Sequence, residues 1–152
     1  MSELFDESAL ADLERQIDGW LDLIRRHNPS IRAIDRGEGD EVRWYVRMHG
    51  EEKEFTTVWL TLGQRSLRYE SYVMPAPLEN AELLYETLLR RNEKLVGAHF
   101  SIGNEDAVFL RGEIFLSSLT EIELDRIIGT LYATIEQCFR PLLKIGFSSQ
   151  VT

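Results

Sequence analysis

The chain has 152 residues, a net charge of −9 at pH 7 and an apolar content of 43%. This length favours one domain, and the apolar content, which includes three Trp, seven Phe and five Tyr, suits a packed core. The acidic balance disfavours nucleic-acid binding, because a phosphate backbone is repelled by a negative surface. The lone cysteine, Cys138, cannot form an internal disulfide, which suits a reducing cytosol.

The start of the chain and the length of its apolar runs bear on its location. The acidic start, Met-Ser-Glu-Leu-Phe-Asp-Glu, lacks the basic and apolar regions of a signal peptide. No uninterrupted apolar run approaches the length of a membrane span. We therefore expect a cytoplasmic protein without membrane association, with a single domain over residues 1–152.

A helix is predicted from about residue 7 to residue 27. Its apolar residues recur at helical spacing: Leu10, Leu13, Ile17, Trp20, Leu21 and Ile24. Asp6 can cap this helix, and Asn28-Pro29 ends it, because proline disfavours helical geometry in the preceding residue. The next stretch, 31–41, is either a linker or a short strand followed by a loop.

Three strands follow, at about 42–49, 55–62 and 67–74. Each alternates between two sets of side chains and is rich in β-branched and aromatic residues, and short polar turns at 50–53 and 63–66 connect them. Period-two alternation with such short connections predicts an antiparallel meander. Pro75 and Pro77 end the third strand.

The second half of the chain predicts a helix, a hairpin and a long helix. The helix at about 80–91 carries one stripe expected to be buried, made of Ala81, Leu84, Tyr85, Leu88 and Leu89. The hairpin pairs strands at about 96–102 and 107–115. The last helix starts at the capping box Thr120–Glu123, and Pro141 is expected to kink or end it. The expected fold is α+β, in the order α-βββ-α-ββ-α, with a five-stranded, mostly antiparallel sheet and helices packed against it.

No catalytic or metal-binding pattern emerges from the sequence. His27, His49 and His99 do not share metal-ligand spacing, and no HExxH, CxxC, Walker A or G-x-S-x-G motif is present. Cys138 lies on the apolar face of the last helix, where an inert, buried thiol is expected. We expect a protein that is not an enzyme and that uses no cofactor or metal.

The predicted sheet is apolar on both faces. One set of side chains is expected to face the helices: Val58, Leu60, Leu62, Val96, Phe100, Ile102, Val108 and Leu110. The opposite set holds Tyr45, Phe55, Trp59, Tyr72 and Phe109, interleaved with Arg43, Arg47, Arg68 and Arg111. Exposed aromatic and arginine side chains are typical of a protein interface. The alternative is that a helix wraps over this face, or that one strand has the opposite register.

Several segments of the second half carry a family resemblance. They are residues 83–96 (LLYETLLRRNEKLV), 98–116 (AHFSIGNEDAVFLRGEIFL) and 119–147, with Arg90-Arg91-Asn92, Phe100, Asn104-Glu105-Asp106 and Leu110-Arg111 at the matching points. The chain resembles the YbjN-like domain family of bacterial proteins, with a type III secretion chaperone-like fold, over roughly residues 10–147. The resemblance implies a link to regulation and stress responses. Secretion chaperones are small, acidic, often homodimeric proteins that bind extended client segments.

Three functional hypotheses follow. The first is a non-enzymatic, chaperone-like or regulatory module that binds a polypeptide, or a second copy of itself, through the aromatic and arginine sheet face or a sheet edge. Its predicted contact residues are Tyr45, Phe55, Trp59, Tyr72, Phe109, Arg43 and Arg68. The second is a small-molecule sensor with a pocket between the sheet and the helices. A third, a hydrolase, would need a deep pocket that holds a carboxyl or histidine with a strongly shifted pKa.

Overall fold

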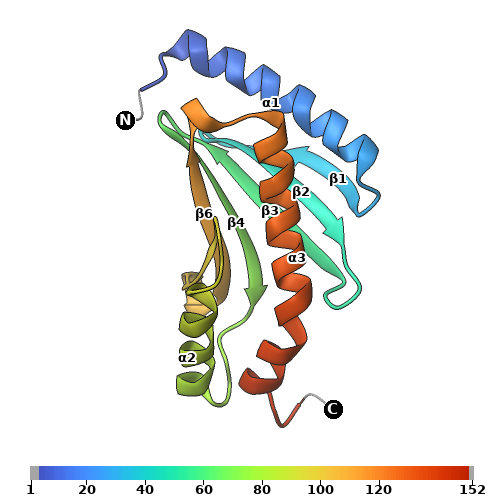
Figure 1. Ribbon diagram of the computed structural model, residues 1–152, viewed down its shortest axis with the longest axis vertical. Helices are drawn as coiled ribbons and strands as arrows, with labels where there is room; N and C mark the ends of the chain where they lie inside the picture. The colour runs from blue at the N-terminus through green and yellow to red at the C-terminus, as the bar shows by residue number, and fades with distance from the viewer. Residues whose placement is uncertain (1–3, 151–152) are drawn as a thin grey trace.

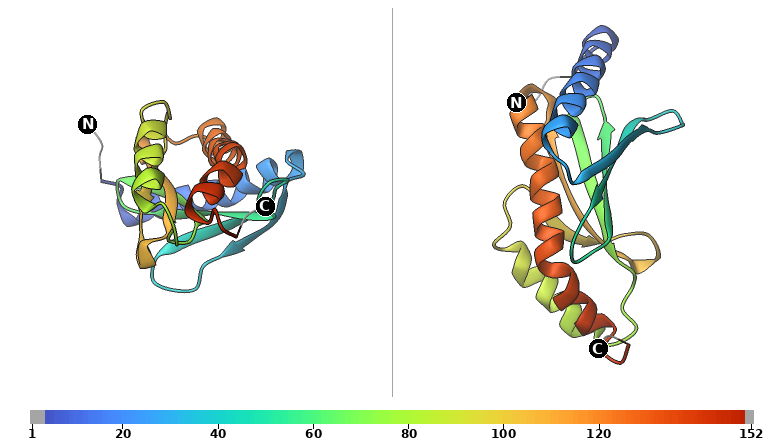
Figure 2. Two further views of the ribbon diagram at one scale, coloured as in Figure 1. Left: turned by 90° about the horizontal axis from the view of Figure 1, so that it is seen from below. Right: turned by 90° about the vertical axis from the view of Figure 1, so that its right-hand side faces the viewer.

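A computed structural model describes residues 4–150 and shows an α+β fold. An antiparallel sheet, in the order β1-β2-β3-β4-β6-β5, lies under helices that all pack on one of its faces (Figures 1 and 2). Its elements are α1 (Glu7–His27), β1 (Ile31–Arg36), β2 (Val42–His49), β3 (Phe55–Leu62), β4 (Ser66–Met74), α2 (Ala81–Asn92), β5 (His99–Ile102), β6 (Val108–Phe115) and α3 (Glu121–Gly146), with short 3-10 turns at Asn104–Asp106 and Leu116–Ser118. The ends of the predicted domain, residues 1–3 and 151–152, lie outside the described residues.

Within residues 4–150 the sheet has six strands, so the predicted number of five is wrong. The additional strand is β1, which pairs antiparallel with β2 and forms one edge of the sheet. Ile31 is buried and Ile34 is packed against the core, and these two side chains hold the strand in place. The Gly37 N–H then donates to the Arg43 carbonyl at 2.8 Å, which continues the pairing past the strand end. Of the two interpretations of residues 31–41, the strand followed by a loop is correct.

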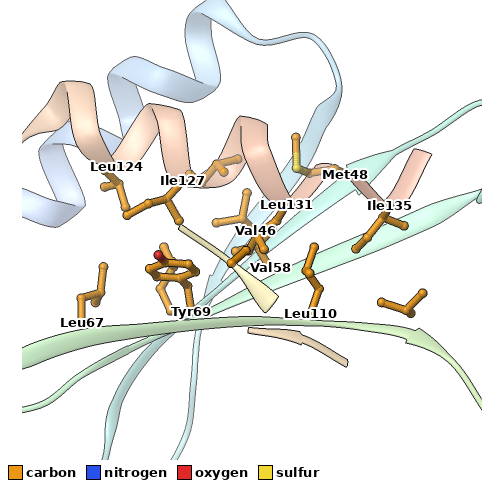
Figure 3. Close-up of a cluster of buried hydrophobic side chains, with 14 of the residues drawn as sticks. Val46, Met48, Val58, Leu67, Tyr69, Leu110, Leu124, Ile127, Leu131 and Ile135 are labelled. Atoms are coloured by element: carbon orange, nitrogen blue, oxygen red, sulfur yellow. The ribbon is translucent and has the colours of Figure 1, made fainter. Parts of the chain in front are cut away.

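The main core lies between the sheet and α3. Helix α3 runs along the sheet and turns one apolar face toward it, and sheet side chains point up to meet that face (Figure 3). The helix contributes Leu124, Ile127, Leu131 and Ile135, and the sheet contributes Val46, Met48, Val58, Leu67, Tyr69 and Leu110, all of them buried. Burial of branched and aromatic side chains of this size contributes roughly 1.5–3 kcal/mol each. This contact fixes which face of the sheet is covered.

Helix α1 is joined to the sheet through Trp44 of β2. The Trp44 ring is buried, and its indole Nε1–H donates to the Asp18 carboxylate of α1 at 2.7 Å. Arg36 of β1 lies over the Trp44 ring at 4.8 Å and bonds Glu14 at 2.5 Å and Asp18 at 3.2 Å. A buried ring and a partly exposed ion-pair network therefore connect the N-terminal helix to strands β1 and β2.

The starts of α1 and α3 agree with the sequence, and α3 runs through Pro141. Asp6 accepts a hydrogen bond from the Ala9 N–H at 2.8 Å, and Thr120 accepts one from the Glu123 N–H at 3.1 Å, so both predicted caps are formed. Of the two outcomes predicted at Pro141, a kink or an end of the helix, the end is excluded, because α3 continues to Gly146. Pro141 and the preceding Gln137 are both exposed, so the carbonyl that loses its partner can be hydrated. The axis of α3 bends in its C-terminal part (Figure 2).

The Thr120 cap gives a direct stability test. Replacing Thr120 with alanine removes the side-chain acceptor for the Glu123 N–H at the start of α3. We expect the free energy of unfolding to fall by about 1 kcal/mol, as for other N-cap threonines. Urea denaturation followed by circular dichroism measures the change. The control is Ser117→Ala, at an exposed position just before the helix; equal loss in both variants would contradict the capping role.

Helix α2 is less buried than its apolar pattern predicts. Leu84 and Leu88 are buried, but Leu89 is 70% exposed and Ala81 is also exposed, so the predicted stripe is only half correct. The strand predicted from residue 96 begins at His99, because Gly97 adopts a φ of +77° that suits glycine and interrupts extended geometry. Val96 therefore lies outside the strand and is exposed, which corrects its predicted place against the helices. Ile102 pairs with the buried Val108 and lies beside α2, on the predicted side of the sheet, but it is 49% exposed.

The C-terminal end of α2 closes the free edge of β5. The Asn92 amide donates to the Phe100 carbonyl at 3.1 Å, and its oxygen accepts from the Phe100 N–H at 2.6 Å. These two bonds reproduce the pairing that a neighbouring strand would offer. Phe100 therefore has no outward backbone group left to pair with another strand.

Candidate functional site

We call the face of the sheet turned away from the helices the open face. In residues 4–150 the helices lie on the opposite side of the sheet (Figure 2), so no helix covers the open face. The residues predicted to contact a partner all lie on it: Tyr45, Phe55, Trp59, Tyr72, Phe109, Arg43 and Arg68. Tyr45 pairs with Trp59 across β2 and β3, and Tyr72 pairs with Phe109 across β4 and β6. The role of these residues in binding stays a prediction.

The aromatic side chains form edge-on pairs across neighbouring strands. The Tyr45 and Trp59 rings lie 5.8 Å apart at 88°, and the Tyr72 and Phe109 rings lie 5.7 Å apart at 86°. Phe55 is 46% exposed and Tyr72 is 39% exposed, while Tyr45 and Trp59 are half-buried. Edge-on packing holds each ring in a fixed orientation without covering it. The open face thus presents fixed aromatic surface to solvent.

Phe109 differs from the other predicted contact residues because it is only 8% exposed. The Arg111 guanidinium lies 4.4 Å from the centre of its ring, and Tyr72 packs against its edge. The turn before β6 also folds over it: a Cβ added at Gly103 would come within 2.5 Å of the Phe109 ring. Phe109 therefore supports the Tyr72 ring from the neighbouring strand and offers little surface of its own.

Lys53, in the turn between β2 and β3, borders the aromatic group. Its ammonium lies 5.8 Å from the Tyr72 ring and donates to the Phe55 carbonyl at 2.7 Å. Burial lowers the pKa of Lys53, and the nearby Glu136 carboxylate partly offsets that shift. The same turn is attached to α3, since Glu136 accepts hydrogen bonds from three successive backbone N–H groups, those of residues 51–53. The turn is therefore held in place beside Tyr72 and Phe55.

The arginines of the open face fall into two groups. Arg43 donates to Glu41 at 2.7 Å and to Thr61 at 2.9 Å, and Arg111 donates to Glu70 at 3.1 Å and to Ser101 at 3.2 Å. Arg47 and Arg68 are exposed, and neither forms an ion pair within the described part of the chain. The first pair of arginines is engaged inside the protein, and the second pair is available to another molecule.

A groove on the same face is lined in part by Arg43, whose guanidinium lies 5.7 Å from the centre of the Trp59 ring, so the groove lies beside Trp59. Its volume is about 580 Å³, and its lining includes Arg43, Arg68, Glu70 and Arg111, together with residues of the β1–β2 loop and the β3–β4 turn. Sequence reasoning named Arg43 and Arg68 but missed Glu70 and Thr61. Glu70 lies opposite both Trp59 and Arg111, so the alternation of β4 against its neighbours was the signal that could have located it.

Within residues 4–150 no group of three or more His, Cys, Asp or Glu side chains is placed to hold a metal ion. Cys138 is buried on α3, and burial raises the pKa of its thiol to about 11, with a partial opposing effect from Arg91. A thiol that stays protonated near neutral pH is a poor nucleophile.

Cys138 should therefore be protected in the folded protein. At pH 8 we expect exchange with an aromatic disulfide reagent to be about a thousandfold slower than in denaturing urea, because reaction requires opening of the core. The control is Gln137→Cys combined with Cys138→Ala, which moves the thiol to an exposed position on the same helix. Rapid reaction of the native thiol, equal to that of the control, would show that the site is accessible.

Space between the sheet and the helices is limited. A hollow of about 150 Å³ lies between β4, β6 and α3, lined by Tyr69, Ile114 and Ile127 among others. A second, of about 250 Å³, lies between α2 and β5 and is lined mainly by apolar side chains, among them Tyr85, Leu89 and Phe100. Pockets that enclose small molecules usually measure roughly 300–1,000 Å³.

In the described part of the chain, no helix has the length and apolarity needed to cross a membrane.

Comparison with known proteins identifies relatives in both sequence and structure. The chain matches the model of the YbjN family, described as "Putative bacterial sensory transduction regulator", over residues 22–144. It is 35% identical over 106 residues to the uncharacterized protein Rv0487 of Mycobacterium tuberculosis, a match that covers 70% of this chain and 58% of that protein. It is 33% identical over 110 residues to the uncharacterized protein ML2442 of Mycobacterium leprae, covering 72% of this chain and 60% of that one. The chain thus spans less than two thirds of the length of these relatives.

A solved structure shares the fold. One chain of the heterodimeric complex ExoU–SpcU, from the type III secretion system of Pseudomonas aeruginosa, superposes with a TM-score of 0.54. The match covers 83% of this chain and 96% of that chain, at 14% sequence identity. Identity at this level supports a common fold and does not by itself assign a function.

Proposed function

Because the chain belongs to the YbjN family, we propose that it is a non-enzymatic, chaperone-like or regulatory module that binds a polypeptide partner through its open face. The observation that carries the proposal is the group of aromatic side chains on a sheet face that no helix within residues 4–150 covers. We also propose that the module acts in the cytoplasm.

The composition of the open face favours a protein partner. Aromatic side chains and arginine are enriched at the centres of protein interfaces, and the open face holds both in one continuous area. Phe55 and Tyr72 expose apolar surface to water, and covering that surface is favourable at about 25 cal/mol per Å². The rings are already held by their neighbours, so binding costs little side-chain entropy.

The shared fold adds support. The solved structure with this fold is a heterodimeric complex, so the same architecture assembles there with a different polypeptide. The identity of the partner in that complex is not used to infer a partner for this chain. What carries over to the proposal is that an α+β domain of this shape can serve as one half of a protein complex.

The open face is a better docking surface than either edge of the sheet. Asn92 occupies the outward backbone groups of Phe100 on β5. On β1, the Arg32 carbonyl accepts a hydrogen bond from Arg25 of α1 at 3.2 Å. A strand that adds to an edge needs a row of unpaired backbone groups, and both edges have lost part of that row. We therefore place the partner on the face.

Selection from a random library of 12-residue peptides tests this proposal. The bait is the native protein, and the comparison bait carries Tyr45→Ala with Trp59→Ala on the open face. We expect peptides enriched on the native protein to bind the double variant at least tenfold more weakly, because the central aromatic surface is gone.

The matched control removes two exposed apolar side chains from the helix side, Leu83→Ala with Leu89→Ala on α2. This variant should bind the same peptides as the native protein. Equal binding by the Tyr45/Trp59 variant, or loss of binding in the α2 variant alone, would overturn the proposal.

A further inference from the structure

Resting on the proposed function, we infer that the groove beside Trp59 binds a carboxylate of the partner at Arg68. The partner segment is extended, and an Asp or Glu stands two residues away from a large apolar side chain. The apolar side chain packs on Trp59 and Tyr45, and the acidic side chain pairs with Arg68. Arg68 is then the residue that selects an acidic partner segment.

The charges around the groove single out Arg68. Arg43 and Arg111 are each neutralised by an acidic neighbour, Glu41 and Glu70 respectively. Glu113 lies opposite Arg68 in the β4–β6 register, but its carboxylate accepts from Ser66 at 2.8 Å and forms no ion pair with Arg68. Arg68 is thus the groove arginine without a charged partner in the described part of the chain, and an incoming carboxylate can pair with it at no cost to an existing bond.

The spacing of the sheet sets the spacing of the partner residues. Trp59 pairs with Glu70 and Thr61 pairs with Arg68, so Trp59 and Arg68 are diagonal neighbours on β3 and β4. Diagonal neighbours on one face lie about 7–8 Å apart. In an extended chain, side chains two residues apart point the same way and are separated by roughly 6.5–7 Å. One apolar and one acidic residue, with a single residue between them, therefore match this pair.

The same charges favour a carboxylate over a nucleic acid. Asp40, Glu41 and Glu70 border the groove, and the whole chain has a net charge of −9. A chain of phosphates would meet these carboxylates along its length, whereas one carboxylate meets only Arg68. A polypeptide with single, spaced acidic residues fits this pattern of charge, and single-stranded RNA serves as the opposing probe.

The test compares the residues that the native protein and two Arg68 variants enrich from the random 12-residue peptide library. On the native protein, Asp or Glu should be enriched two residues from Phe, Leu, Ile or Trp. Arg68→Gln should abolish the acidic preference while the apolar preference remains, and Arg68→Lys should retain both. For one enriched peptide, fluorescence anisotropy should show binding to Arg68→Gln weakened about fivefold, and this difference should shrink at high salt.

The control is Arg90→Gln, which removes an exposed charge from α2 on the other side of the sheet and should leave binding unchanged. Enriched peptides with apolar residues but without acidic ones would overturn this inference and leave the proposed function standing. Absence of any enriched peptide would overturn both. Tighter binding of a 12-nucleotide single-stranded RNA than of every enriched peptide would overturn the assignment of the partner as a polypeptide.

Discussion

Replacing Trp44 with alanine is expected to lower the free energy of unfolding by about 3–5 kcal/mol, the usual cost of removing a buried Trp or Phe ring. Trp44 is fully enclosed, so the vacated volume cannot be filled without moving β2 or α1. The change also removes the hydrogen bond to Asp18 and the surface under Arg36. Urea denaturation followed by circular dichroism measures the loss.

Trp44→Phe is the matched variant, since it keeps most of the apolar volume and removes the indole N–H. We expect it to cost about 1–2 kcal/mol, because Asp18 keeps its bond to Arg36. A loss below about 1 kcal/mol for Trp44→Ala would mean that Trp44 does not join α1 to the sheet. That outcome would also remove the basis for assigning the two faces of β2.

Replacing Trp59 with alanine is expected to weaken binding strongly and to lower the stability only slightly, in contrast to Trp44→Ala. Binding of a selected peptide should weaken by about 2 kcal/mol, roughly thirtyfold, because Trp59 lies between Tyr45 and Arg43 at the centre of the aromatic surface. The fold should survive with a loss of about 1 kcal/mol, since the ring is only half-buried and its cross-strand contacts are modest. Fluorescence anisotropy gives the affinity, and urea denaturation gives the stability.

Two further variants separate a specific role of Trp59 from a general effect. Trp59→Phe retains an aromatic ring on the open face and should recover most of the affinity. Leu89→Ala removes a more exposed apolar side chain on α2 and should leave the affinity unchanged. An unfolded Trp59→Ala protein, or one that binds the peptide as tightly as the native protein, would show that Trp59 is not a contact residue.

Much of the fold could be predicted because its elements have strong local patterns. The long apolar stripes of α1 and α3, the capping residues Asp6 and Thr120 and the alternation of β2, β3 and β4 each act over neighbouring residues. Strand β1 has only Ile31 and Ile34 to mark it, with charged residues between and after them, so its pattern could not separate a strand from a linker. Its place in the sheet comes from pairing with β2, the next strand along the chain, and the alternation within residues 31–36 does not reveal that pairing.

The errors near α2 have a common cause. Leu89 and Val96 are apolar, but the sheet ends beside α2 with the four-residue strand β5, which leaves little surface to bury them. Gly97 shortens that strand from its N-terminal side through its positive φ. The apolar pattern of a helix indicates which residues share a face, but the extent of the partner surface decides how many of them are buried.

The composition of the open face was partly predictable, because alternation along a strand is a local pattern. Period-two alternation assigned Tyr45, Trp59 and Arg68 to one side of the sheet, and they do share that side. The burial of Phe109 depends on the turn at Gly103, and the pairing of Arg111 with Glu70 depends on the β4–β6 register. Neither is visible in the residues nearest to Phe109 or Arg111, because both arise from strands brought together only in the folded protein.

The three tryptophans of the chain allow one measurement to test the central claim directly. Trp59 lies on the open face, Trp44 lies in the core and Trp20 lies on α1, so their indole N–H resonances report on three separate regions. In the NMR spectrum of ¹⁵N-labelled protein titrated with a selected peptide, the Trp59 indole signal should shift progressively while the Trp44 and Trp20 signals stay in place. A saturating peptide that leaves the Trp59 signal unmoved and shifts the Trp20 signal would place the binding site on the helices and contradict the account.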